Sequence, residues 1–224
     1  AQLEQCPHMS DVTDIGERVS VDEAEFYPSD EDDAQTAALI DCGTKKSIVD
    51  SLNERGADVH VLPYDATKED VEAVDPDLLF VSNGPGDPAN FEPTEELVVE
   101  SVDEVPIAGI CLGQQIVARA VGGDTEKMDF GHRGVNQPVL DHDSGRVVMT
   151  TQNHGYTVAD PGDLEVTQVN VNDDTPEGLD SEALDVLTRQ YHPEANPGPH
   201  DTLDFFDDVL AMTTTSTPKV AIAD

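Results

Sequence analysis

The sequence is poor in basic residues, and this shortage argues against one class of partner. Of 224 residues, 11 are lysine or arginine and 48 are aspartate or glutamate, which gives a formal net charge of −37. No basic stripe is present to meet phosphates, so we expect no binding of nucleic acid. The acidic residues are spread along the chain rather than gathered in one tail. This pattern favours adaptation to concentrated salt, with a basic partner as the alternative.

Long apolar runs and cysteines are also scarce. No run of about 18 apolar residues occurs, so we expect no membrane span. The three cysteines include no C-x-x-C pair, which argues against a disulfide framework or a zinc site and fits a reducing cytoplasm. We therefore expect a cytoplasmic protein without a bound metal. There is no internal repeat and no coiled-coil heptad.

Strand-like and helix-like segments alternate in the first half of the chain. We expect strands at 36–41, 58–62, 77–81 and 105–110, and helices at 45–55, 67–74 and 113–121. This alternation predicts an α/β fold with a mostly parallel, doubly wound sheet flanked by helices. After Lys127 the pattern changes to additional short β segments and a last helix, expected at 146–151, 164–171, 183–191 and 202–212.

Residues 109–115 (GICLGQQ) set a cysteine between glycines at the end of an apolar run. Cys111 falls at the corner between an expected strand and the helix that follows it. Such a sharp turn needs small neighbours and pushes one side chain out over the end of the sheet. The nearby helix N-terminus also favours the reactive thiolate. Local sequence alone leaves a buried structural cysteine as an equal alternative.

A second candidate site lies far along the chain, in residues 190–194 (QYHPE). Residues two apart in an extended segment project to the same side, so Glu194 can approach the ring of His192 and fix its tautomer. The other ring nitrogen can then face a thiol. Pro193 cannot donate a ladder hydrogen bond, which indicates that the segment leaves the sheet there. A structural histidine is the alternative, and the possible pairing with Cys111 favours a base.

A glycine-rich loop, residues 82–88 (SNGPGDP), directly follows the apolar segment 78–81. Its backbone N–H groups could cradle an anion, either a phosphate or the oxyanion formed when a thiolate attacks a carbonyl. The loop lacks the G-x-x-x-x-G-K-[ST] spacing of a P-loop. Taken alone, it is more typical of an ordinary turn than of an anion site.

Together these motifs resemble the triad-type, or class I, glutamine amidotransferases. Within that group the chain is most similar to the small, glutamine-hydrolysing subunits of carbamoyl-phosphate synthetase. Many amidotransferases share the cysteine motif, whereas three further strings in this order are specific. They are residues 130–134 (FGHRG), 152–156 (QNHGY) and 192–201 (HPEANPGPHD). The resemblance runs from about residue 37 to residue 210.

The resemblance implies a Cys-His-Glu triad that acts through a thioester. Cys111 would be the nucleophile, His192 the general base and acid, and Glu194 the carboxylate that orients the histidine. Backbone N–H groups of Gly84 and Leu112 would stabilise the oxyanion. Five further residues would hold the glutamine or line its pocket, with plain strand-and-turn structure as the alternative for each: Gly86, Gln115, Asn153, Gly155 and Tyr156.

The resemblance also implies a partner and a pathway. The ammonia would pass to a large synthetase subunit, in a heterodimer or higher assembly, that makes carbamoyl phosphate from bicarbonate and ATP for arginine and pyrimidine biosynthesis. This chain would need no cofactor of its own, and ATP and Mg²⁺ would serve the partner. We expect structural hydrogen bonds for His132, His154 and His200, and a buried thiol for Cys42.

The chain departs from the family pattern at three positions. Histidine is frequent where Gln114 stands, and glycine and histidine where Val135 and Gln137 stand. Gln114 is no triad member, so its replacement does not affect the expected hydrolysis. Val135 and Gln137 fall in a segment that in the family lies near the ammonia route, so coupling to a partner is the less certain property.

We expect three parts in the chain. Residues 1–35 would be a linker and the remnant of a missing N-terminal domain, residues 36–212 the amidotransferase domain, and residues 213–224 a disordered tail. Two alternatives stay open. One is a glutaminase subunit of another pathway, such as anthranilate or guanylate synthesis, against which the PGPHDT continuation at 197–202 argues. The other is a catalytically silent docking fragment.

Overall fold

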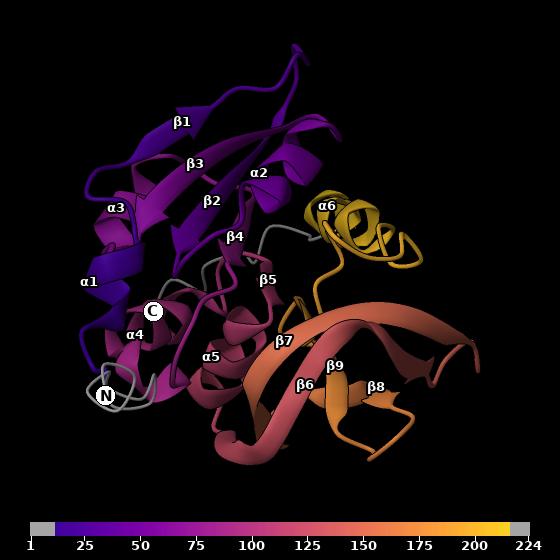
Figure 1. The fold of residues 1–224 in the computed structure, drawn as a ribbon. Coiled ribbons are helices and arrows are strands. Elements are labelled where there is room, and N and C mark those ends of the chain that lie inside the picture. Colours follow the sequence, from indigo (N-terminus) through magenta and orange to yellow (C-terminus); the bar gives the residue numbers. More distant parts are fainter. Residues whose placement is uncertain (1–11, 216–224) are drawn as a thin grey trace.

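The computed structural model describes residues 12–215 and forms one ten-stranded sheet with helices on both faces (Figure 1). The strand order is β1-β3-β2-β4-β5-β10-β9-β8-β6-β7. The predicted α/β class is confirmed. Two halves meet at β10, a parallel half on one side and an antiparallel half on the other.

The parallel half contains the strands that the sequence predicted. They are β2 (Gln35–Asp41), β3 (Ala57–Pro63), β4 (Leu78–Val81) and β5 (Ile107–Ile110), continued by β10 (Val186–Arg189). Each is parallel to its neighbour within this group. Their carboxyl ends therefore lie along one edge, where ligands of doubly wound sheets bind.

Alternate residues of β2 explain why both faces carry helices. Ala38 and Ile40 pack into one apolar cluster, and Ala37 and Leu39 into another. The first cluster includes residues of α1 (Ile15–Val19), α3 (Lys68–Glu72), α4 (Glu92–Ser101) and α5 (Leu112–Ala120). The second includes residues of α2 (Lys46–Asn53) and α6 (Phe205–Thr215). A strand buried on both faces is apolar throughout, as in the run Leu78–Val81.

The antiparallel half is a ladder that extends beyond β10. It consists of β6 (Asp124–Asp141), β7 (Val147–Asp160), β8 (Glu165–Asn170) and β9 (Pro176–Ser181). The β6–β7 pair is long, curved and interrupted by register shifts, and it runs alongside α5 (Figure 1). This hairpin brings residues 124–160 next to the end of β5.

The structure contains elements that the sequence pattern did not predict. These are α1, β1 (Glu25–Tyr27), the short 3₁₀ helix η3 (Pro88–Asn90), α4, β6 and β9. For β6 the reason is physical, because Gly131, Gly134 and Pro138 interrupt the apolar alternation that identifies a strand. Partner strands on both sides hold it in place.

Part of the segment predicted as a linker joins the folded unit. β1 pairs antiparallel with β3, and Ile15 of α1 lies in the first apolar cluster. The predicted boundary at residue 36 therefore does not mark the edge of the folded part. At the other end, α6 continues three residues past the predicted limit of 212. The predicted tail from 216 on and the cysteine at position 6 lie outside the described residues.

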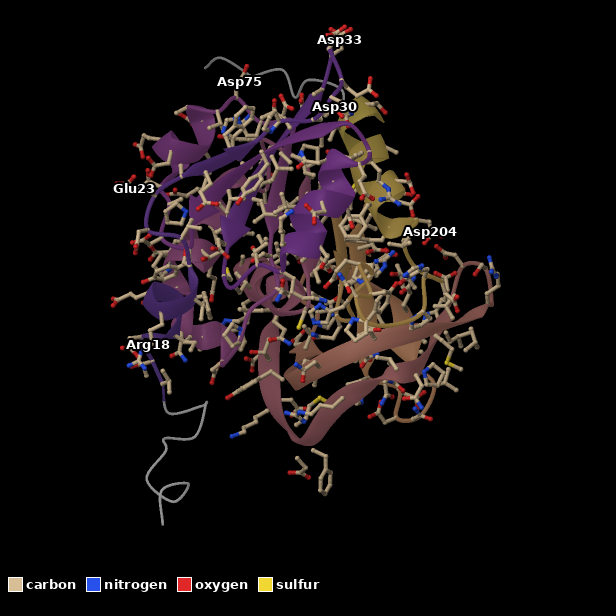
Figure 2. All side chains as sticks on the ribbon, turned by 45° about the horizontal axis from the view of Figure 1, so that its top comes forward. Arg18, Glu23, Asp30, Asp33, Asp75 and Asp204 are labelled. Atoms are coloured by element: carbon tan, nitrogen blue, oxygen red, sulfur yellow. The ribbon has the colours of Figure 1, made fainter. Side chains whose placement is uncertain are left out.

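Acidic side chains cover the outside of the molecule. Glu23, Asp30, Asp33, Asp75 and Asp204 are all exposed and point outward at its rim (Figure 2). None of the helices within residues 12–215 combines the length and hydropathy that crossing a bilayer requires. The charge is thus a surface property, whereas the two apolar clusters lie on either side of the sheet.

Candidate active site

Cys111 occupies the corner between β5 and α5, at the carboxyl edge of the parallel half. Its backbone has φ 56° and ψ −103°, a left-handed conformation that a residue with a Cβ rarely adopts. Its N–H donates to the Arg189 carbonyl at 2.7 Å, which ties the corner to β10. The structure thus contains the sharp strand-to-helix corner that the sequence predicted, in the geometry typical of a nucleophile elbow.

Small neighbours make this corner possible. A Cβ at Gly113 would overlap the carbonyl oxygen of Val81, and one at Gly109 would lie 2.9 Å from the backbone of Gly113. The helix and the strands are therefore packed backbone against backbone at this point. The glycines flanking Cys111 are a steric requirement of the turn.

His192 and Glu194 lie beside Cys111, just beyond the end of β10. The His192 Nδ1 and the Glu194 Oε1 are 2.8 Å apart, and His192 and Cys111 line the same cavity. The His192 N–H donates to the Thr151 carbonyl at 2.8 Å, so β7 also holds this segment. The structure thus brings together three residues separated by up to 83 positions (194 minus 111).

The surroundings of His192 favour the protonated ring. Burial alone would lower the pKa of His192, but the hydrogen bonds to Cys111 and Glu194 raise it to about 10. Burial also opposes the ionisation of Glu194, yet His192 and then Lys45 lower the pKa of this carboxyl below its ordinary value. At neutral pH the ring is therefore an imidazolium beside an ionised Glu194 carboxylate.

A cavity of about 380 Å³ opens over Cys111. All seven residues predicted for substrate and oxyanion binding line it: Gly84, Gly86, Leu112, Gln115, Asn153, Gly155 and Tyr156. Its volume falls in the range of small-molecule sites, about 300 to 1,000 Å³. The cavity has walls from both halves of the sheet, since the loop after β4 forms one side and β6 and β7 form the other.

The loop after β4 approaches the corner closely. A Cβ at Gly84 would overlap the Cys42 carbonyl and lie 2.5 Å from a methyl group of Leu112. Gly86 has φ +94° and packs against Ile15. Because Leu112 is the first residue of α5, its N–H has no partner within the helix. Gly84 and Leu112 therefore bring backbone groups to the cavity on either side of Cys111.

Gln115 joins the α5 side of the cavity to β7. Its Nε2 donates to the Tyr156 carbonyl at 2.9 Å and to Gln190 Oε1 at 3.0 Å. Asn153 is exposed at the cavity wall, with Gly155 and Tyr156 half-buried beside it. These contacts fix β7 as a wall of the cavity relative to α5, the helix that follows Cys111.

A second cavity of about 550 Å³ lies next to the first, and Cys111 borders both. His192, Lys45 and Val135 are among its lining residues. Gln137 lines neither cavity, and its carbonyl and side chain accept hydrogen bonds from Thr150 and Asn172. Of the departures from the family pattern, Val135 is thus the one beside the site. Gln114 is fully buried and accepts from Thr188.

A buried cluster behind β7 offers the one group of potential metal ligands found within residues 12–215. Ligand atoms of His132, His154 and Glu177 all lie within 4.8 Å of one another. His132 Nδ1 faces Glu177 Oε1 at 3.2 Å, and its Nε2 faces Asp173 Oδ2 at 2.8 Å. Glu177, opposed by burial and aided by Asp173, raises the pKa of His132 to about 9. A protonated ring has no lone pair for a metal, so these contacts favour an ion-pair cluster.

The pKa of His154 is shifted in the opposite direction from that of His132, although the two rings lie 5.0 Å apart. Its Nδ1 donates to the Tyr156 carbonyl at 2.8 Å, and burial lowers its pKa to about 4. His154 is therefore neutral and fixes the backbone of the cavity wall. Both histidines make the structural hydrogen bonds expected of them. Cys42 is buried as predicted, and burial raises the pKa of its thiol to about 12.

The sequence motifs did not indicate several charged residues at the site. Lys45 contacts Glu194, while Lys127, Asp129 and Arg133 line the first cavity together with Phe130. Lys45 follows β2, so the shared carboxyl edge of parallel strands was the signal that could have indicated it. Arg133 and Phe130 belong to the string FGHRG, which identified the family but carried no assigned role.

Comparisons with known proteins agree with this architecture. The description "Glutamine amidotransferase class-I" belongs to a family profile that matches residues 38–212. The carbamoyl phosphate synthase small chain of Halobacterium salinarum is 73% identical over 222 residues, which cover 99% of this chain and 62% of that protein. The protein of the same name from Archaeoglobus fulgidus is 47% identical over 209 residues, covering 92% and 58%.

The chain thus spans less than two thirds of the length of these curated relatives. Among solved structures, a protein from Thermoplasma acidophilum described as a putative GMP synthase subunit has a TM-score of 0.71 at 19% identity. The match covers 82% of this chain and 96% of that one. At that identity the likeness supports the fold and says nothing of the reaction.

Proposed function

The chain belongs to the class-I glutamine amidotransferase family, and from this premise we propose that it is the glutamine-hydrolysing part of a carbamoyl-phosphate synthetase small subunit. One observation carries the proposal: Cys111, on a strained elbow, faces an imidazole held at 2.8 Å by Glu194 at the base of a cavity of about 380 Å³. The small-chain relatives specify which amidotransferase.

In the first half of the reaction the Cys111 thiolate attacks the side-chain amide carbon of glutamine. The C=O electron pair moves onto oxygen, and the backbone N–H groups of Gly84 and Leu112 are the donors suited to this oxyanion. As the tetrahedral intermediate collapses, the C–N bond breaks and protonated His192 gives its proton to the nitrogen. Ammonia leaves, and an acyl thioester remains on Cys111.

In the second half water hydrolyses the thioester. His192, now neutral, takes a proton from the water as it adds to the thioester carbon, and the same donors stabilise the second oxyanion. The C–S bond then breaks, which releases glutamate and returns the thiolate and imidazolium. Glu194 holds the ring in one tautomer through both halves, which is the role of the third member of a triad.

The charges around the cavity suit an amino-acid substrate. Arg133 and Lys127 supply positive charge for an α-carboxylate, and Asp129 supplies negative charge for an α-ammonium group. Gln115 and Asn153 supply amide groups nearer the side chain. We assign the polar end of glutamine to the β6 side of the cavity and its amide to the Cys111 side.

The ammonia would serve a partner. Following the small-chain relatives, we assign a large synthetase subunit that uses bicarbonate, ATP and Mg²⁺ to make carbamoyl phosphate, in the cytoplasm. The second cavity, which borders Cys111 and His192, is the side on which ammonia would leave. Val135, one of the departures from the family pattern, lies at the wall of this cavity. The coupling to a partner is therefore the part of the proposal that most needs a test.

A glutaminase assay in molar KCl tests the reaction. We expect glutamate release by the chain, and faster release when a large subunit from a related haloarchaeal enzyme is added. Cys111→Ser and His192→Asn should each reduce turnover at least a thousandfold, because each removes a member of a unit that acts together. Circular dichroism should show both variants folded.

Three outcomes would contradict parts of the proposal. Near-normal turnover in either variant would reject the triad. No glutamate release, with no labelling of Cys111 by a glutamine-like electrophile, would favour a silent docking fragment. Glutamate release that a synthetase large subunit leaves unchanged, but that an anthranilate or guanylate synthesis partner stimulates, would move the chain to another pathway.

A further inference from the structure

Lys45 makes a contact with the triad that neither the sequence motifs nor the comparisons assign. Its Nζ lies 2.8 Å from Glu194 Oε1, the same oxygen that His192 Nδ1 contacts at 2.8 Å. It also lies 3.5 Å from the Ala195 carbonyl. Lys45 precedes α2 by one residue and is 149 positions away from Glu194 in the chain.

The backbone of Lys45 is held by the glycine-rich loop. Its N–H donates to Asn83 Oδ1 at 3.0 Å, and Asn83 Nδ2 donates to the Gly43 carbonyl at 3.1 Å. Asn83 directly precedes Gly84, the residue at the cavity. One set of hydrogen bonds thus links the position of the Lys45 ammonium to the loop on the other side of Cys111.

The charge balance of the site requires a cation at this position. The Glu194 side chain is fully buried, and its Oε2 has no hydrogen-bond partner among the described residues. In the proposed reaction the His192 imidazolium balances the charge of the Cys111 thiolate, which leaves the Glu194 charge for another partner. Buried ions that lose their partner are strongly destabilised, so Lys45 completes a neutral set of four.

The other titratable and charged groups around His192 and Glu194 do not replace Lys45. Arg133 of β6 lines the same second cavity, but its side chain is exposed and its Nη1 donates to the Phe130 carbonyl. His154 of β7 is neutral. The Lys45 side chain is only 33% exposed, so water screens its contact with Glu194 incompletely.

We propose that Lys45 is a positioning residue that keeps Glu194 ionised and directed at His192. The inference rests on the proposed triad. Its consequence follows from charge alone: a buried set that loses a cation takes up a proton at a higher pH, whichever atom holds the proton. Because an opposite charge at this distance shifts a titration by about 1 to 3 units, loss of Lys45 moves the titration of the set upward by about one pH unit.

Alkylation of Cys111 measures this titration without any glutamine. The full chain in molar KCl is treated with iodoacetamide across pH 5 to 10, and the Cys111 peptide is quantified by mass spectrometry. We expect the midpoint of the alkylation rate to rise by about one unit in Lys45→Met, and the acid limb of kcat/KM for glutamine to move with it. Lys45→Arg should restore both, because it returns the charge.

Two further variants make the test specific. Lys46→Met removes the neighbouring lysine, which is exposed and pairs with Asp50 on its own helix, and it should leave the midpoint unchanged. Lys45→Gln keeps a donor for Glu194 but lacks the charge, so it should show the shift even if Lys45→Met does not fold. An unshifted midpoint in Lys45→Gln, or an equal shift in Lys46→Met, would overturn the proposal. A wild-type enzyme that alkylates normally but releases no glutamate would count against the proposed function alone.

Discussion

The two halves of the sheet are stabilised by different interactions. In the parallel half β2, β4 and β5 are buried between two apolar clusters, and the elbow of Cys111 is packed backbone against backbone. In the antiparallel half the interior includes buried polar groups: His132 contacts Glu177 and Asp173, Asn170 contacts Glu177, and Tyr191 contacts Gln168.

Under the proposed function, this difference separates the residues assigned to the reaction from those assigned to substrate recognition. Cys111 and the Gly84 loop follow strands that are packed between two apolar clusters. The opposite wall of the cavity, with Asn153 and Arg133, stands on a ladder that includes the buried, charged His132. A buried polar network is costly when one member is lost, so the recognition wall should be the more sensitive half.

Lowering the salt concentration should have the largest effect and tests whether the halves fold as one unit. A net charge of −37 repels itself, and this repulsion is screened when the Debye length falls to about 3 Å at about 1 M salt. We expect circular dichroism to show a loss of secondary structure below a few tenths molar KCl, roughly where the Debye length rises above 5 Å.

Hydrogen exchange during that loss would compare the halves directly. Since β5 and β10 join them in one sheet, protection in β2–β5 and β6–β9 should disappear together and return when KCl is restored. Earlier loss in β6–β9 would show that the ladder unfolds on its own. An unchanged spectrum in low salt would contradict the salt requirement itself.

The variants Glu177→Gln and Leu79→Ala test the interiors of the antiparallel half and the parallel half, respectively. Leu79 is fully buried in the first apolar cluster, and its truncation should cost about 3 kcal/mol of unfolding free energy at every pH. Glu177→Gln leaves the His132 charge with Asp173 alone and should cost about 3 kcal/mol at pH 6. Urea unfolding at constant molar KCl measures both.

The pH dependence distinguishes the two variants. His132 has a folded pKa of about 9, above its ordinary value of 6.5, so its ion pairs stabilise the fold fully below pH 6.5. That stabilisation is lost as the pH rises through 9. The loss of unfolding free energy caused by Glu177→Gln should therefore shrink between pH 6.5 and 9, while the loss caused by Leu79→Ala stays constant. If the losses of unfolding free energy in the two variants depended on pH in the same way, His132 would not be charged.

Arg133→Gln should have the smallest effect and tests the recognition wall alone. If Arg133 binds the α-carboxylate of glutamine, its loss removes a charged hydrogen bond and raises KM about tenfold with kcat unchanged. Arg146→Gln is the matched control, because Arg146 is exposed in the β6–β7 turn and lines neither cavity. A fall in kcat with unchanged KM would place Arg133 in the reaction instead of in recognition.

The sequence by itself determined the features that depend on neighbours in the chain. Apolar periodicity located the strands and helices of the parallel half. The glycines beside Cys111 indicated the elbow, because only small residues permit that turn. Glu194 lies beside His192 as predicted, although the cause is a turn that the Ala195 N–H closes on the His192 carbonyl at 3.1 Å and not an extended segment. In each case the physical cause acts over a few residues, so a local pattern was sufficient to predict it.

Only the tertiary structure decided which distant groups meet. Lys45 reaches Glu194 across 149 positions because β2 and β10 both end at the same edge of the sheet. β6 is a strand because its partners hold it, although its own glycines and Pro138 argue otherwise. The opposite charge states of His132 and His154 follow from burial and from the carboxylates around one ring. Strand order and burial are set by the packing of the whole chain, and no short segment carries them.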